Sequence, residues 1–109
     1  MLMIYANPAS PAGADAMAEA GAIMEELGES GELVGGQALE GPAAARTVKV
    51  RDGVPAVTDG PFIEAKEYLA GYLVVECDGI ERATEIAARW PDAKLCAMEV
   101  WPVINEVTG

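Results

Sequence analysis

The stretch RTVKVRDGVPAVT, residues 46–58, decides the fold of this chain. Polar and apolar side chains alternate at every second residue across 46–51, which predicts a strand. The pair Asp52-Gly53 is typical of a tight turn and returns the chain into a second strand over 54–58. Pro55 has no N–H to give to a neighbouring strand. We therefore expect a β-hairpin at the periphery of the fold.

The segments before the hairpin predict a strand, a helix and another strand. Residues 1–6 are short and apolar, as in a first strand. Apolar side chains recur every three or four residues over 15–30, with glutamates between them, which predicts an amphipathic helix ending near Gly28 or Gly31. Residues 33–39 are apolar but interrupted by two glycines, which predicts an irregular or bulged strand; close approach of a ligand to the backbone is the alternative.

The segments after the hairpin repeat that order. Residues 69–77 are strongly apolar and predict a strand. Residues 80–90 carry apolar and charged side chains on opposite faces of a helix, with Asp78 expected as its N-cap and Pro91 as its stop. Residues 94–103 predict the closing strand.

This order predicts an α+β fold, a ferredoxin-like sandwich in which an antiparallel sheet carries two helices on one face and an inserted β-hairpin. The strands are apolar on both sides, so the face away from the helices would expose a large apolar surface in a monomer. We therefore expect a homodimer in which two sheets form a shared, barrel-like core. Polar residues are expected at its rim or in a pocket, among them Lys49, Arg51, Glu76 and Glu99.

Length and charge narrow the class of protein. A chain of 109 residues that is 51% hydrophobic favours a single domain over 1–109. The 7 Lys+Arg and 18 Asp+Glu residues give a net charge of −11, which repels phosphate backbones and anionic lipids. We therefore expect no nucleic-acid partner and no membrane partner. Residues 1–6 lack the flanking positive charges of a signal peptide, and no apolar run approaches the roughly 18 residues that span a bilayer, so a cytoplasmic protein is expected.

Histidine is absent from the sequence, and this excludes Ser-His-Asp triads and histidine-based metal sites. Cys77 and Cys96 are too far apart for a C-x-x-C motif and lie among apolar residues, so we expect structural thiols. The Gly35-Gly36 pair lacks the context of a nucleotide-binding loop. We expect no metal and no cofactor.

The most distinctive segment is VTDGPFIEAKE, residues 57–67, which resembles the DGPF motif of the YCII-related (YciI-like) family. The likeness continues through four other segments: 47–53, 71–76, 87–91 and 98–103. The resemblance implies a dimeric α+β barrel. Many members of this family have no established activity, and some lie beside sigma-factor genes. Distant relatives on the same fold are isomerases, dehalogenases and monooxygenases that act on small aromatic or lactone compounds.

The residues of this motif are the candidates for chemistry. Asp59 matches the family aspartate and is a candidate general acid or base, followed by Glu64, Lys66 and Glu67. Lys66 could hold an anionic substrate or lower the pKa of a neighbouring carboxylate, and Phe62 could anchor the loop in the core. The family resemblance implies a histidine paired with the aspartate, but this chain has none. The alternative is that Asp59-Gly60 forms a structural turn and that Asp59 has no catalytic role.

Two functional hypotheses follow. In the first, the dimer is an enzyme that uses Asp59 on an apolar small molecule. The ligand-binding residues would be Phe62, Glu64, Lys66, Tyr5, Tyr72 and Trp101, with the last three as walls. In the second, the dimer is a non-catalytic module that binds a metabolite or a protein partner, as in sigma-factor-linked regulation. A solvated acidic helix face is the default explanation of the remaining charge.

Overall fold

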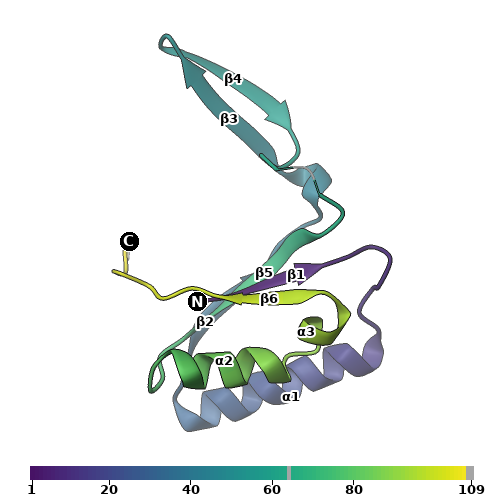
Figure 1. Ribbon diagram of the computed structural model, residues 1–109, viewed down its shortest axis with the longest axis vertical. Helices are drawn as coiled ribbons and strands as arrows, with labels where there is room; N and C mark the ends of the chain where they lie inside the picture. The colour runs from purple at the N-terminus through teal and green to yellow at the C-terminus, as the bar shows by residue number, and fades with distance from the viewer. Residues whose placement is uncertain (64, 108–109) are drawn as a thin grey trace.

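The computed structural model describes residues 1–63 and 65–107 (Figure 1). The strands and helices, in chain order, are β1 (Leu2–Ala6), α1 (Ala14–Ser30), β2 (Leu33–Ala38), a short 3-10 helix (Pro42–Ala44), β3 (Arg46–Arg51), β4 (Val54–Asp59), β5 (Tyr68–Val75), α2 (Ile80–Arg89), α3 (Asp92–Leu95) and β6 (Ala97–Val100). These bounds confirm the predicted hairpin, the long first helix and the strand on each side of it.

Within residues 1–63 and 65–107, the main sheet has four strands in the order β2-β5-β1-β6, and every neighbouring pair is antiparallel. The helices cover one face of this sheet, and the β3–β4 hairpin projects from the other side (Figure 1). The ferredoxin-like α+β architecture with an inserted hairpin is therefore confirmed. The sheet is open, with β2 and β6 at its edges.

The core lies between the sheet and the helices. Among the described residues, its buried apolar members are Leu2, Ile23, Leu27, Leu73, Ala83, Ile86, Ala87 and Trp90. Because side chains alternate along a strand, the neighbours of Leu2 and Leu73 lie on the opposite side of the sheet. That side, which we call the open face, carries Met3, Tyr5, Tyr72, Val74 and Glu99.

Helix α1 ends where the glycines predict. The Gly31 N–H donates to the Gly28 carbonyl at 3.3 Å and the Glu32 N–H donates to the Leu27 carbonyl at 3.0 Å. These two bonds form a Schellman motif, which satisfies carbonyls that the helix leaves free. The chain then enters β2, whose register against β5 shifts between Leu33 and Gly35, so the predicted irregularity is confirmed.

Two details of the second half differ from the prediction. The N-cap of α2 is Gly79, and Asp78 lies one residue before it. Gly79 has a φ of 104°, a conformation that side chains with a Cβ rarely adopt, so the turn places glycine at the cap position. The closing strand is also shorter than predicted, because the extra helix α3, with Pro91 as its N-cap, takes up Asp92–Leu95.

The helices in the described part of the chain fall short of the length and apolar character that a membrane span needs. Cys77 and Cys96 are half-buried free thiols.

Candidate functional site

A cavity of about 1080 Å³ lies where the hairpin joins the main sheet. Its volume is slightly above the range of ligand pockets, about 300 to 1,000 Å³. The lining residues are Tyr5, Leu39, Glu40, Gly41, Pro42, Ala44, Ala45, Pro61, Phe62, Ile63, Ala65, Lys66, Glu67, Tyr68 and Leu69. Most of these side chains are apolar. We call this space the base cavity.

Two connecting segments form most of the base cavity, one before the hairpin and one after it. They are held together at the hairpin base, where the Gly60 N–H donates to the Ala45 carbonyl at 2.7 Å and the Thr47 hydroxyl donates to the Gly60 carbonyl at 2.8 Å. Gly60 has a φ of 93°, which favours glycine. At the sheet end, the Leu39 N–H donates to the Ala70 carbonyl at 2.8 Å. The cavity wall is thus fixed at both ends.

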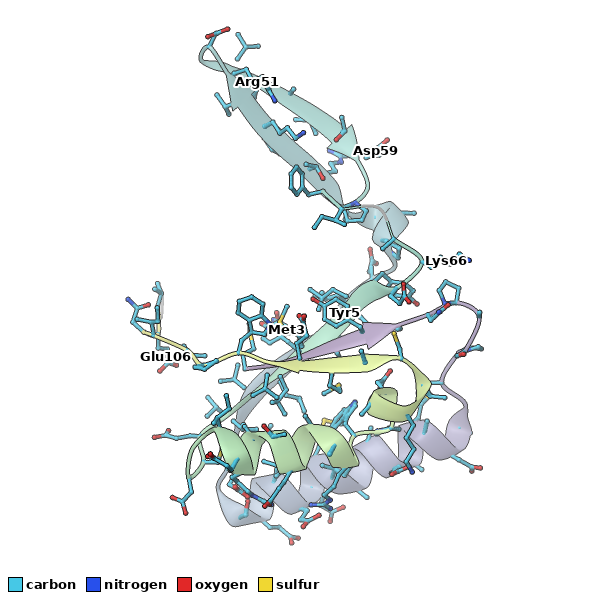
Figure 2. All side chains as sticks on the ribbon, in the orientation of Figure 1. Met3, Tyr5, Arg51, Asp59, Lys66 and Glu106 are labelled. Carbon is cyan, nitrogen blue, oxygen red and sulfur yellow. The ribbon has the colours of Figure 1, made fainter. Side chains whose placement is uncertain are left out.

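Asp59 is the last residue of β4 and stands opposite Arg46 in the hairpin ladder. It is exposed and is not among the residues that line the base cavity. Figure 2 shows it on the hairpin, apart from Tyr5 on the main sheet. The turn that follows it therefore shapes the hairpin base, while its carboxylate faces solvent in the single chain.

Phe62 and Lys66 both line the base cavity. The Phe62 ring is 71% exposed, so the expectation that it anchors the loop in the core is wrong. Its neighbour is the Lys49 ammonium, 5.0 Å from the ring centroid, which is within the range of a cation–π contact. Lys66 is exposed, and its side chain extends away from the body of the molecule (Figure 2). Glu64 lies outside the described residues.

The aromatic residues predicted as walls gather on and beside the open face. The Tyr5 hydroxyl donates to Glu99 Oε1 at 2.9 Å, and the Trp101 indole N–H donates to the same oxygen at 3.1 Å. The hydroxyl of Tyr72 on β5 donates to Oε1 of Gln37, its partner on β2, at 2.8 Å. Of the three aromatic residues, only Tyr5 also lines the base cavity.

The Glu99 carboxylate further stabilises the protonated form of the Tyr5 hydroxyl. Its hydrogen bond with the hydroxyl, then partial burial, then its negative charge raise the pKa of Tyr5 above the ordinary value of 10.0. Tyr5 therefore remains a neutral hydrogen-bond donor at physiological pH. Met3 and Tyr5 both point to the side of the sheet from which the hairpin projects (Figure 2).

The sequence analysis missed the apolar residues of the connecting segments, among them Leu39, Ala44, Ile63 and Leu69. Neither strand nor helix periodicity runs through these segments, so no pattern marks which side chains point inward. Within the described residues, no cluster of three or more carboxylates and thiols is arranged to hold a metal ion.

An ion pair at the opposite end of the molecule ties α2 to the residue before β2. Arg82 donates to Glu32 from Nε at 2.8 Å and from its second terminal nitrogen at 2.9 Å, and Ser30 donates at 2.9 Å. These bonds, with that of Arg82 as the largest cause, lower the pKa of Glu32 from 4.5 to about 2.

We expect this ion pair to make stability depend on pH between these two values. Because the folded-state pKa is the lower one, the pair stabilises the fold fully above about pH 4.5 and loses its effect as pH falls through about 2. Glu32→Gln should therefore flatten the acid side of the stability profile. Urea unfolding midpoints from about pH 6 to about pH 2 measure this, with Glu29→Gln as the control. Parallel profiles for wild type and Glu32→Gln would contradict it.

The sequence of this chain is similar to those of known proteins. A family model described as YCII-related domain matches residues 1–106. A relative from Rhizobium meliloti (strain 1021), named uncharacterized protein R00369, is 32% identical over 71 residues. The match covers 65% of this chain and 57% of the relative, so the chain spans less than two thirds of that protein's length.

Proposed function

The chain belongs to the YCII-related family, and from that premise we propose that it is a homodimeric protein that binds a small, largely apolar molecule in the base cavity. The observation that carries this proposal is the cavity itself, about 1080 Å³ in volume and lined mainly by apolar side chains. Ligand sites in proteins are concave and mostly apolar, with few polar groups that orient the ligand. Among the described lining residues, those with polar side-chain groups are Tyr5, Glu40, Lys66, Glu67 and Tyr68.

The lining favours an uncharged or aromatic ligand. Phe62, Leu69 and the prolines offer apolar surface, and burying such surface gives roughly 25 cal/mol per Å². In the described part of the lining, two carboxylates, Glu40 and Glu67, accompany one lysine, so a negatively charged ligand would meet repulsion. N-phenyl-1-naphthylamine, a neutral aromatic dye that fluoresces in apolar surroundings, is therefore a suitable probe.

Placing a large side chain in the base cavity should weaken its affinity for this dye. Ala44 lines the cavity and is exposed in the 3-10 helix, so a larger side chain there enters the cavity without disturbing the core. We expect Ala44→Trp to weaken dye binding at least tenfold, or about 1.4 kcal/mol. Fluorescence titration of wild type and variant measures the change.

The matched control is Ala43→Trp, which introduces the same ring one residue earlier, at an exposed position outside the lining. Its dye affinity should equal that of wild type within about twofold. Equal affinities in all three proteins would refute the base cavity as the binding site.

The function proposed for the base cavity is ligand binding and not acid–base catalysis by Asp59. Asp59 is exposed on the hairpin and does not line the base cavity, so a ligand held there has no contact with this carboxylate in the single chain. General acid–base catalysis requires hydrogen-bond reach between the side chain and the reacting proton. This placement supports a binding role for the cavity.

The homodimer is supported by the open face. Met3, Tyr72 and Val74 lie on the side of the sheet opposite the helices, and Trp101 beside them is 54% exposed. A sheet that is apolar on both sides is ordinarily covered on both. Light scattering should give twice the 11.3 kDa mass of the chain. A mass of one chain at every concentration would overturn this part of the proposal.

A further inference from the structure

The β3–β4 hairpin stands apart from the main sheet. Its strands form a separate two-stranded sheet in which each pairs with the other from Arg46 opposite Asp59 to Arg51 opposite Val54. In Figure 1 it projects well beyond the open face. An isolated two-stranded hairpin is at best marginally stable in water, because neither face is packed. Something in the working protein is therefore expected to cover it.

One face of the hairpin is apolar. In the ladder Val48 stands opposite Val57, and Val50 stands opposite Pro55, so these four residues share a face. The valines at 48, 50 and 57 are 61%, 63% and 56% exposed. At the hairpin base the pair Arg46 and Asp59 extends this face. The other face is mixed: its polar side chains are Thr47, Lys49, Arg51 and Thr58, and Val54 and Ala56 lie among them. The face with Val48, Val50, Pro55 and Val57 therefore needs a protein surface to cover it, whereas the face with Lys49 and Arg51 can remain in water.

The charge on the hairpin favours a second copy of this chain as that neighbour. Strand β3 carries Arg46, Lys49 and Arg51, three of the chain's 7 Lys+Arg residues. The hairpin also carries Asp52 and Asp59, so its net charge is +1, whereas the rest of the chain carries −12. The body of a second copy therefore presents a strongly negative surface to a weakly positive hairpin. Charge complementarity of this kind steers association and selects the partner.

The hairpin is also long enough to reach around such a copy. Each of its strands has six residues, which extend about 20 Å at roughly 3.3 Å per residue. Two sheets packed face to face lie about 10 Å apart. A hairpin of this length therefore extends past the sheet of a second copy that packs against the open face.

We propose that the β3–β4 hairpin is an arm whose apolar face, formed by Val48, Val50, Pro55 and Val57, packs on a second copy of this chain. The proposal rests on the homodimer proposed above and adds to it the surface that holds the two copies together. In a two-fold symmetric dimer the arm of each copy packs on the other copy, so every arm contact occurs twice.

Two neighbouring substitutions on β4 test the arm. Val57→Lys places a charge on the apolar face, and Thr58→Lys places the same charge on the opposite face one residue later. The dimer dissociation constant, measured by sedimentation, should rise at least about tenfold for Val57→Lys because the lost contact occurs twice. For Thr58→Lys it should change by less than about threefold.

A second measurement uses the wild-type chain and so does not depend on how the variants fold. Hydrogen exchange at the amides of β3 and β4 should slow as protein concentration rises through the dimer dissociation constant. Protection that is the same at all concentrations, with a dimer unaffected by Val57→Lys, would overturn the arm and leave the homodimer standing. A monomer at every concentration would overturn both. Dye binding to the base cavity, followed in the same samples, reports on the ligand proposal separately.

Discussion

Replacing Gly36 by alanine is expected to lower the free energy of unfolding by about 3 kcal/mol. A Cβ at this position would clash with the Tyr72 carbonyl oxygen and would lie 2.9 Å from a methyl carbon of Leu73. The first of these is a backbone atom of β5, the strand paired with β2, so relief requires the two strands to move apart. Gly71 shows the same closeness from the other side, because its Cβ would lie 2.7 Å from the Gln37 carbonyl oxygen.

The matched control is Gly35→Ala, one residue earlier on the same strand. A Cβ at Gly35 would have no heavy atom within 4 Å among those of the described residues, so its effect should stay within about 1 kcal/mol. Urea denaturation at one protein concentration compares the two variants. Because β2 leads directly to Leu39 in the cavity wall, Gly36→Ala should also weaken dye binding. Equal unfolding midpoints for the two variants would contradict the close approach of β2 and β5.

Replacing Leu27 by alanine is expected to cost about 3 kcal/mol of stability. Its side chain is fully buried at the end of α1, within the cluster that includes Leu2 and Ile86. Removing it leaves a space between the sheet and the helices that the surrounding residues only partly refill. Such a loss is a large fraction of the roughly 5 to 15 kcal/mol that a domain of this kind has in total.

The comparison for this variant is Met24→Ala on the same helix. Met24 is 39% exposed, so its truncation should cost less than about 1 kcal/mol. Chemical denaturation at a fixed protein concentration keeps any contribution from association the same in both proteins. A Leu27→Ala protein as stable as the Met24→Ala protein would show that the core is not centred where α1 meets the sheet.

The strands and helices were predictable because each has a repeating pattern. Apolar side chains at three- and four-residue spacing marked α1, and alternation marked β3. Pro55 correctly indicated a peripheral hairpin, since it removes a ladder donor. The fold class then followed from the order of elements. The short helix α3 was not predictable, because four residues are too few to show a period.

The geometry of the candidate site was predictable only in part. The sequence predicts Tyr5, Phe62 and Lys66 as site residues, and all three line the base cavity. Asp59 was selected because of its motif, but its distance from the cavity depends on how the hairpin leaves the sheet. That direction is set by backbone angles in the connecting segments, including the positive φ of Gly60, and side-chain patterns do not encode it.

The contact between Tyr5 and Glu99 illustrates the same limit. The two residues are 94 positions apart, and they meet because β1 and β6 pair in a register that places Met3 opposite Glu99. A shift of one residue would move Glu99 to the helix-covered face. The register depends on which side chains of β6 fill the core, namely Met98 and Val100, and this emerges only when the strands are packed.

The most direct test of a ligand site in the base cavity is to map the neutral dye onto the chain by nuclear magnetic resonance. Titration of N-phenyl-1-naphthylamine into isotopically labelled protein should shift the amide signals of Leu39, Ala44, Ala45, Ile63 and Leu69 most strongly, since these residues line the cavity. Val34, on β2 outside the lining, should not shift. Shifts centred on Val34 or the helices, with the cavity residues unchanged, would contradict the account.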